Sequence, residues 1–323
     1  MKFPIPKRFK NRLGKIFFLS PLFLFLTFFF LILLLGIGVS FLGNEKSIID
    51  FFQKAPFVGF ANYEEILLSK DSSFLGGFLN ALRNSVIYTI CVSTGCVVLG
   101  LFGAVLMQQN FKGVGFLRFL LLLSWVVPTY VVGILWGFMW QQNEGVINVL
   151  LFDVLHFDVI TSFIGAGWEY HAGKLIKPRW LTGQNTIWAI IVPTIWRSWP
   201  FYMMMFWVGL SSISRETYEN AEIDGAGKIS AFFNITLPQL RPIFALVILQ
   251  SVVLNMYSFN LVAMMFGNGS GFPGKFGDLL MTFIYRATFQ TWNFGLGAAL
   301  STLFMGVMLF AVFFWYRLFR EDI

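Results

Sequence analysis

Long apolar runs constrain this chain more than any other feature of its sequence. A helix needs about 20 consecutive apolar residues to cross the roughly 30 Å hydrocarbon core of a bilayer. Six stretches reach that length and predict spans at about 16–42, 84–107, 116–140, 186–210, 243–266 and 293–316. Each is expected to be a helix, because backbone polar groups must be satisfied within lipid and the runs lack the two-residue alternation of barrel strands. The predicted fold is therefore an all-α membrane protein with six transmembrane helices.

The composition excludes an ordinary cytosolic protein. Hydrophobic residues make up 57% of the 323 positions and charged residues only 12%, which is about half the usual charged share. A chain of this composition has too little polar surface to cover a water-soluble globule. The lipid bilayer is therefore the expected surrounding of most of the chain.

Positive charge is concentrated in an N-terminal tail, residues 1–15, which precedes the six-span domain of residues 16–323. The net charge is +7, and six of the 23 lysines and arginines lie in this tail. They are Lys2, Lys7, Arg8, Lys10, Arg12 and Lys15. A basic tail beside an apolar run favours anionic lipid headgroups as its partner and argues against nucleic acid. The positive-inside rule then predicts that both termini are cytoplasmic.

Patterns typical of catalysis or metal binding are missing from the sequence. Cys91 and Cys96 fall in one span, about 140° apart around a helix, so they predict packing residues and neither a disulfide nor a metal site. His156 and His171 have no ligand partners at a known spacing. No phosphate-binding glycine loop or nucleophile–base arrangement is present. We therefore expect a chain that is not an enzyme and holds no metal or cofactor of its own.

The segment 211–242 is polar and lies between the fourth and fifth predicted spans. Ser214 is suited to cap a helix, Glu216 suits its positive N-terminal end, and Gly225 is suited to end it in the left-handed conformation. A second short helix would carry an apolar stripe of Ile229, Phe232, Phe233 and Ile235. Two interpretations remain: a solvated loop anchored to the inner leaflet, or a rigid knuckle presented to a cytoplasmic partner.

The spacing within this segment resembles the EAA signature of the permease subunits of ATP-binding-cassette importers. Glu219-x-Ala221 is followed by Gly225, and nine residues later by Ile235-x-Leu237-Pro238. The surrounding residues Asp224 and Ala226 resemble the carbohydrate-importing branch, as do the stretches 57–63, 84–89 and 195–201. The resemblance extends from about residue 15 to 318. Two positions depart from it, because Asn220 and Ser214 stand where alanine and proline are more usual.

This resemblance implies a coupled import mechanism in a bacterial inner membrane. The first helix of the segment would be a coupling helix seated in a separate ATPase subunit, two copies of which would use ATP and magnesium. A second homologous permease would complete the pathway, and an extracytoplasmic solute-binding protein would dock on the outer loops. The residues implied in coupling are Glu219, Ala221, Asp224, Gly225, Ala226, Ile235, Leu237 and Pro238.

Polar and aromatic residues within the spans indicate where a solute could pass. A lone cation inside a span is costly, so Arg197 is a candidate pathway residue. The alternative is that Arg197 satisfies backbone carbonyls freed by Pro193 and Pro200, or lies near the outer interface. Sugars combine hydroxyl groups with apolar faces, which suits amide, phenol, hydroxyl and indole side chains. The further candidates are Trp196, Tyr202, Ser124, Tyr130, Asn255, Tyr257 and Asn260.

Taken together, these patterns predict a permease subunit for a sugar or sugar derivative. A glycerol-phosphate-like solute is the first alternative, because Arg197 would be a natural contact for an anion. A secondary transporter is less favoured, because the spans show neither intramembrane acids nor an inverted repeat. Within the external segment 141–185, the stretch 153–180 is either a docking loop or a plain connector. The Gly133-x-x-x-Gly137 pattern in the third span predicts close helix packing.

Overall fold

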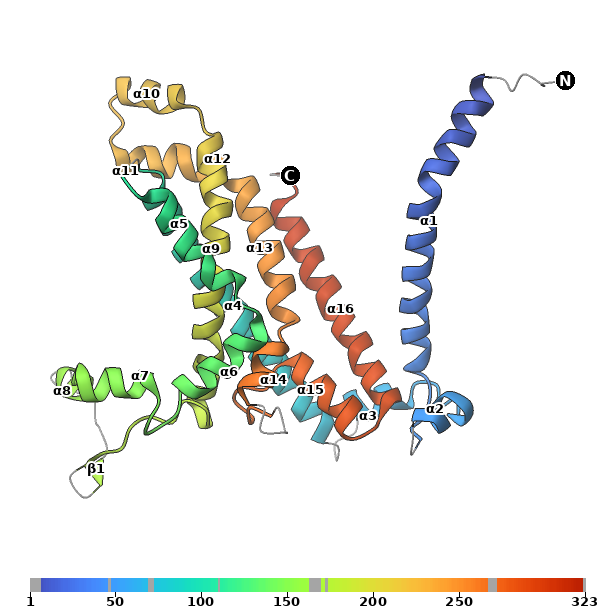
Figure 1. The fold of residues 1–323 in the computed structure, drawn as a ribbon. Helices are drawn as coiled ribbons and strands as arrows, with labels where there is room; N and C mark the ends of the chain where they lie inside the picture. Colours follow the sequence, from blue (N-terminus) through green and yellow to red (C-terminus); the bar gives the residue numbers. More distant parts are fainter. Residues whose placement is uncertain are drawn as a thin grey trace. The chain divides into compact units, whose positions relative to one another are not determined.

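The computed structural model describes residues 7–45, 48–68, 73–109, 111–162, 170–171, 174–266 and 272–321, so residues 1–6 of the basic tail lie outside it. Its regular structure is almost entirely helical (Figure 1), which confirms the all-α class. The helices are α1 (Lys7–Val39), α2 (Ile48–Lys54), α3 (Ala61–Leu67), α4 (Ser73–Met107), α5 (Val114–Val126), α6 (Thr129–Met139), α7 (Val146–Asn148), η1 (Val149–Val154), α8 (Phe157–Ser162), η2 (Gly183–Asn185), α9 (Thr186–Ser212), α10 (Arg215–Ile223), α11 (Lys228–Ala231), η3 (Phe232–Thr236), α12 (Leu237–Gln239), α13 (Arg241–Met256), α14 (Asn260–Met265), α15 (Leu280–Tyr285), η4 (Arg286–Gln290) and α16 (Phe294–Phe319). The two-residue strands β1 (Tyr170–His171) and β2 (Lys174–Leu175) form a small antiparallel hairpin.

Among the described residues, three helices are long and apolar enough to cross a membrane, or five if each of two bent helix pairs counts as one span. The three are Leu19–Val39, Phe74–Met107 and Phe294–Phe319, at the predicted first, second and sixth spans. Helix α9 lies at the predicted fourth span but is not among them. Its internal Pro193 and Pro200 and the charge of Arg197 make it less apolar. The count of six spans stays a prediction.

The third predicted span, 116–140, is broken. Helix α5 ends at Val126, α6 begins at Thr129, and the two axes differ in direction by 89°. Pro128 lies in the break and explains it, because proline has no backbone N–H to donate and disfavours the helical conformation in the residue before it. Val127 accordingly has an extended ψ of 126°. The apolar run therefore forms two short helices with a sharp corner between them.

The fifth predicted span, 243–266, is interrupted as well. Helix α13 ends at Met256 and α14 begins at Asn260. With 16 residues, α13 alone rises about 24 Å, less than the thickness of a hydrocarbon core. Ser258 lies in the gap, and its hydroxyl is 3.0 Å from that of Tyr88. At its other end, α13 follows the Lys228–Gln239 stretch with a bend of 63°.

By its internal contacts the chain divides into two compact units, Met1–Leu75 with Ile284–Met305, and Gly76–Phe283 with Gly306–Ile323. In the first unit, the stretch after α1 is fixed by the segment 57–63. The Asn62 amide donates to the carbonyls of Ser40 (2.8 Å) and Leu42 (2.9 Å) just beyond the end of α1. Such a contact satisfies carbonyls that a helix end leaves free. The Phe41 ring packs against Tyr63, at 5.8 Å between centroids.

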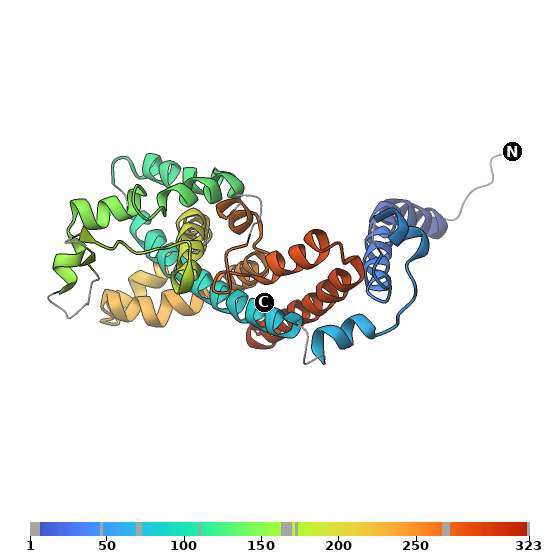
Figure 2. The ribbon, with the colours of Figure 1, turned by 90° about the horizontal axis from the view of Figure 1, so that it is seen from below.

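In the second unit, α9 packs against α5, α6, α13 and α14 and runs through the middle of the unit (Figure 2). Its contact with α4 is close, because a Cβ at Gly100 would lie 3.0 Å from the backbone nitrogen of Met203. Helix α6 packs equally closely on α14, since a Cβ at Gly133 would lie 2.5 Å from the Leu261 carbonyl oxygen. A Cβ at Gly137 would lie 3.1 Å from the next such carbonyl, that of Met265. The close packing predicted for this glycine pair is confirmed.

Candidate functional site

The segment 211–242 forms two stacked layers of short helices at one end of the second unit, opposite α7 and α8 (Figure 1). Helix α10 is capped by Ser214, whose Oγ accepts a hydrogen bond from the backbone N–H of Thr217 at 3.3 Å. Glu216 lies in its first turn. The chain then turns and returns as α11, η3 and α12. The predicted pair of short helices with a corner is therefore present.

The corner after α10 is a Schellman motif built on four of the predicted coupling residues. Gly225 has a φ of +80°, the left-handed conformation predicted for it. The N–H of Ala226 donates to the Ala221 carbonyl at 2.9 Å, and the N–H of Gly225 donates to the Glu222 carbonyl at 3.0 Å. These two bonds, with Asp224 as the capping residue, satisfy carbonyls that the helix would leave unpaired. The position of Gly225 thus has a direct backbone explanation.

The two layers are joined to each other and to α9. The Tyr218 hydroxyl on α10 lies 2.9 Å from the Thr236 hydroxyl in η3. Below them, α9 approaches the start of α13 closely, because a Cβ at Gly209 would lie 2.8 Å from side-chain atoms of both Leu240 and Ile243. The predicted residues Ile235, Leu237 and Pro238 lie in η3 and α12, within this lower layer. The segment is therefore a compact attachment to α9 and not a loose loop.

The outer surface of the segment is open. Glu219 makes an ion pair with Arg215 one turn earlier (2.9 Å), and their side chains are 58% and 92% exposed. Such an exposed pair contributes little to stability, typically under about 1 kcal/mol. Large apolar side chains are exposed beside it: Ile223, Ile229 and Phe233. A soluble surface rarely carries this combination without a partner.

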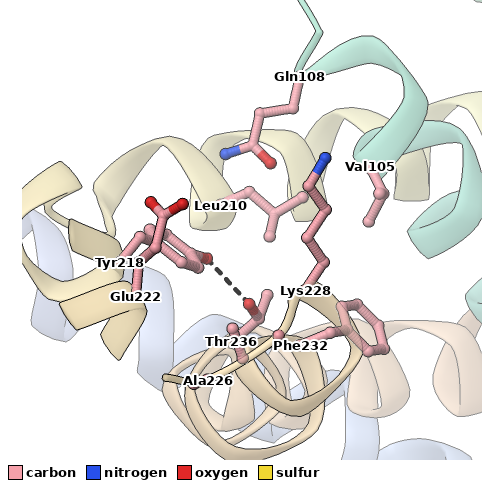
Figure 3. Close-up of a pocket in the computed structure, with 11 residues that line it drawn as sticks. Val105, Gln108, Leu210, Tyr218, Glu222, Ala226, Lys228, Phe232 and Thr236 are labelled. Atoms are coloured by element: carbon pink, nitrogen blue, oxygen red, sulfur yellow. Dashed lines mark hydrogen bonds between the residues drawn. The ribbon is translucent and has the colours of Figure 1, made fainter. Parts of the chain in front are cut away.

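A pocket of about 450 Å³ lies between α10 and the helix ends beneath it (Figure 3). Its apolar lining comes from the ends of α4 and α9 and from η3, through Val105, Leu210 and Phe232. Glu222 and Lys228 reach it from different sides, and the Tyr218–Thr236 hydrogen bond crosses its base. The remaining lining residues are Gln108, Ala226, Gly227 and Ala231. Packing beneath α10 is therefore incomplete, which leaves room for it to move.

Arg197, the predicted pathway cation, is bound to the broken third span. Its Nε–H donates to the carbonyl oxygen of Val127 at 2.9 Å. The break at Pro128 deprives this carbonyl of a helical partner, so the hydrogen bond satisfies a group that would be costly to leave bare in lipid. The alternative predicted for Arg197, a bond to a carbonyl freed by Pro193 or Pro200, is not the one found. The carbonyl that Arg197 binds lies instead at the break beside Pro128.

The other predicted pathway residues on α5, α6 and α9 do not form one cluster. Trp196 is partly exposed and packs edge-on against Trp136, with centroids 5.9 Å apart. Tyr202 is buried and Tyr130 is exposed. Ser124 donates to the Leu121 carbonyl of its own helix at 2.9 Å.

Two small, partly buried polar clusters connect α4, α9 and the α13 region. The Tyr88 hydroxyl contacts those of Thr194 (2.9 Å) and Ser258 (3.0 Å). In the second cluster, the predicted residue Asn255 donates to Ser251 at 3.0 Å, and Ser251 donates to Ser93 at 2.7 Å. The predicted residues Tyr257 and Asn260 lie outside both clusters and are exposed. Sequence reasoning missed the hydroxyl residues, whose available signal was their position inside otherwise apolar runs.

Within the segment 141–185, predicted to be external, a buried asparagine joins several described residues. The Asn148 amide, fully buried, donates to the carbonyls of Gln142 (2.8 Å) and Pro178 (3.0 Å). Its Oδ1 accepts from the Trp180 indole at 2.7 Å, and that indole packs on Trp140 with centroids 5.0 Å apart. Of the two interpretations, a plain connector is less consistent with this network.

No group of three potential metal ligands is found among the described residues. Cys91 and Cys96 are both free, and Cys96 is buried, as expected of packing residues. His156 lies in an exposed turn with a φ of 47°. The His171 backbone belongs to β1.

Comparisons with known proteins show the family to which the chain belongs. Residues 96–323 match the family described as binding-protein-dependent transport system inner membrane component. The probable ABC transporter permease protein y4oQ of Sinorhizobium fredii is 30% identical over 267 residues, 82% of this chain and 77% of that protein. The trehalose/maltose transport system permease protein MalF of Thermococcus litoralis is 26% identical over 311 residues, 95% of each chain.

A solved structure shares the fold. It is a chain of a bacterial ABC transporter involved in the import of the acidic polysaccharide alginate, with a TM-score of 0.70 and 19% identity. The similarity covers 98% of this chain and 99% of that one. Because the family match covers more than half of the sequence, it fixes the class of the protein. The chain belongs to the family of binding-protein-dependent transport system inner membrane components, and it is a multi-pass membrane transport subunit, not an enzyme.

Proposed function

We propose that this chain is the permease subunit of an ATP-binding-cassette importer for a sugar or sugar derivative. The substrate class rests on similar proteins named for carbohydrate transport, the trehalose/maltose permease and the alginate importer. The observation that carries the transport role is the capped helix α10, which is held against α9 and open on its outer surface. In this proposal the spans lie in a bacterial inner membrane with both termini in the cytoplasm.

The proposed partners follow from the surfaces that the chain leaves open. Helix α10 would seat in one of two ATP-binding subunits, which would bind ATP and magnesium, since the sequence of this chain has no phosphate-binding glycine loop. Glu219 and the exposed apolar residues Ile223 and Ile229 would form the contact. A second, homologous permease would complete the pathway. A solute-binding protein would dock on the external side, where the network around Asn148 holds the loop in shape.

The proposed coupling is mechanical. ATP-driven closure of the two ATPases would move α10, and the Tyr218–Thr236 bond and the packing at Gly209 would pass this motion to α9 and α13. The 450 Å³ pocket beneath α10 gives the helix space to shift. The solute pathway beside α9 would then open alternately to the cytoplasm and to the outside.

The test is affinity purification of the tagged chain from its native membrane in mild detergent, followed by reconstitution in liposomes. We expect an ATPase and a second permease to co-purify, and ATP to drive uptake of a labelled oligosaccharide delivered by its binding protein. Gly225→Pro should lose the ATPase, because proline fixes φ near −65° and cannot adopt +80°. The matched control is Gly227→Ala, where φ is −71°.

Three results would redirect the proposal. Uptake of glycerol phosphate in preference to sugars would favour the first alternative within the same class. Uptake driven by an ion gradient without ATP would favour a secondary transporter. If the chain purified alone, or if Gly225→Pro retained the ATPase, α10 would be a membrane-anchored connector.

A further inference from the structure

Arg197 has more hydrogen-bonding capacity than this chain uses. A guanidinium group carries five N–H donors and no acceptor. Only the Nε–H has a partner among the described residues, the Val127 carbonyl at 2.9 Å. The four N–H bonds of the two Nη atoms have no protein acceptor there, and no Asp or Glu of the described chain pairs with the charge. The positive charge is therefore fixed in place by one nitrogen and left uncompensated at the other two.

This charge lies in an apolar region where compensation matters. Arg197 is only partly exposed and sits on α9 between Pro193 and Pro200. A charge inside a membrane segment is expensive and is normally paired or turned toward a water-filled path. Aqueous screening also weakens with burial, so an anion placed there would be bound more strongly than at an open surface.

Two exposed aromatic residues adjoin Arg197 and its partner carbonyl along the chain. Trp196, next to Arg197 in the sequence, is 43% exposed, and its indole packs on Trp136. Tyr130, in the first turn of α6 just beyond the carbonyl that Arg197 binds, is 53% exposed. An indole face and a phenol provide the apolar and hydroxyl contacts that a saccharide can use. The guanidinium adds a planar fork that matches the two oxygens of a carboxylate or the oxygens of a sulfonate or phosphate.

We infer that the solute carried by this permease bears a negatively charged group, and that the free Nη donors of Arg197 receive it. The inference rests on the proposed function and narrows its substrate class to acidic saccharides. The Nε–Val127 bond has a separate role in it, since it fixes the guanidinium at the break between α5 and α6 and so aims the remaining donors. One side chain therefore contacts both the anion and the break between α5 and α6.

The test measures binding to the purified membrane complex without any solute-binding protein, so that only the permease selects the solute. The probes are a glucuronate-containing disaccharide and a neutral disaccharide of the same size, titrated by calorimetry at low ionic strength. We expect the wild-type complex to bind the acidic disaccharide about tenfold or more tightly than the neutral one, because charge-assisted hydrogen bonds are the stronger kind. Arg197→Gln should remove this preference, and Arg197→Lys should retain part of it.

A matched control separates binding from positioning. Trp125 stacks on Phe201 at 5.1 Å and also ties the end of α5 to α9, but it carries no charge. Trp125→Leu should lower the affinity for both disaccharides alike and preserve their ratio. If Arg197→Gln behaved in the same way as Trp125→Leu, Arg197 would be a positioning residue only and the inference would fail.

The inference and the proposed function can fail separately. A wild-type complex that contains its ATPase and imports neutral sugars, yet binds the acidic disaccharide no more tightly than the neutral one, overturns the inference alone. A complex without an ATPase overturns the proposed function. In every variant, co-purification of the complex serves as the check that the chain is assembled.

Discussion

Replacing Gly225 with alanine should weaken the binding of the proposed ATPase to this chain by about 5- to 30-fold. A Cβ built on Gly225 meets nothing within 4 Å, so the substitution causes no clash. Its whole cost comes from the φ of +80°, at which an L-residue is about 1–2 kcal/mol less stable than glycine. If the free variant relieves this strain by opening the corner, the ATPase must restore the closed corner when it binds. Binding then loses 1–2 kcal/mol, which corresponds to about a 5- to 30-fold loss of affinity.

The assay is titration of the purified ATPase onto the permease complex in detergent, with the wild type, Gly225→Ala and Gly227→Ala in parallel. Gly227 is the matched control because it is also free of neighbours within 4 Å, but its φ of −71° suits alanine. Gly225→Asn should fall between wild type and Gly225→Ala, since asparagine tolerates the left-handed region better than other residues.

Two outcomes would refute this reasoning. Equal affinities for wild type and Gly225→Ala would show that the ATPase does not need the left-handed corner. An equal loss in Gly225→Ala and Gly227→Ala would show that the added methyl groups, and not the backbone strain, disturb the contact.

Two further substitutions test the packing described above. Gly133→Ala should lower the thermal stability of the purified chain by about 1–3 kcal/mol, because its Cβ would lie 2.5 Å from the Leu261 carbonyl oxygen. Gly306→Ala, with nothing within 4 Å, should not, and an equal effect of the two would contradict the packing argument. Asn148→Ala should open the segment around Asn148 to protease, because it strips the partly buried Trp180 indole and two carbonyls of their partners, at a cost of up to about 1–3 kcal/mol for each group. Unchanged digestion would mean that the network is not what holds this segment.

The segment around α10 was largely predictable because its structure follows local rules. Ser214 caps the helix and Gly225 ends it, and both roles depend only on residues within one turn of each. The Schellman pair at Ala221 and Ala226 was not predicted from the residues, and it explains the glycine at 225 but not the alanines, because any non-proline residue makes such backbone bonds. What the sequence could not provide is the Tyr218–Thr236 contact, which joins residues 18 positions apart.

The spans were predicted as apolar runs, and hydropathy alone could not show where they break. Pro128 marks a corner in the sequence, but a hydropathy average over about 20 residues is barely changed by one proline. The interruption after Met256 carries no proline or glycine, so neither usual marker was present. The partners of Tyr88 are still less predictable, because Thr194 and Ser258 are 106 and 170 positions away in the sequence.

The position of Arg197 depends both on the local break at Pro128 and on the packing of α9 against that break. Pro128 leaves a bare carbonyl at Val127, and in lipid such a group needs a donor from another helix. A neutral donor would suffice for that purpose, as the Trp140 indole does when it donates at 3.0 Å to the Ala189 carbonyl of α9, whose helical partner would be Pro193. An arginine supplies one bond to the carbonyl and leaves a full charge with four donors, at a cost that backbone satisfaction alone does not explain. The cost of placing this charge is explained if the Nη atoms of the guanidinium bind an anion that is present only while the solute passes.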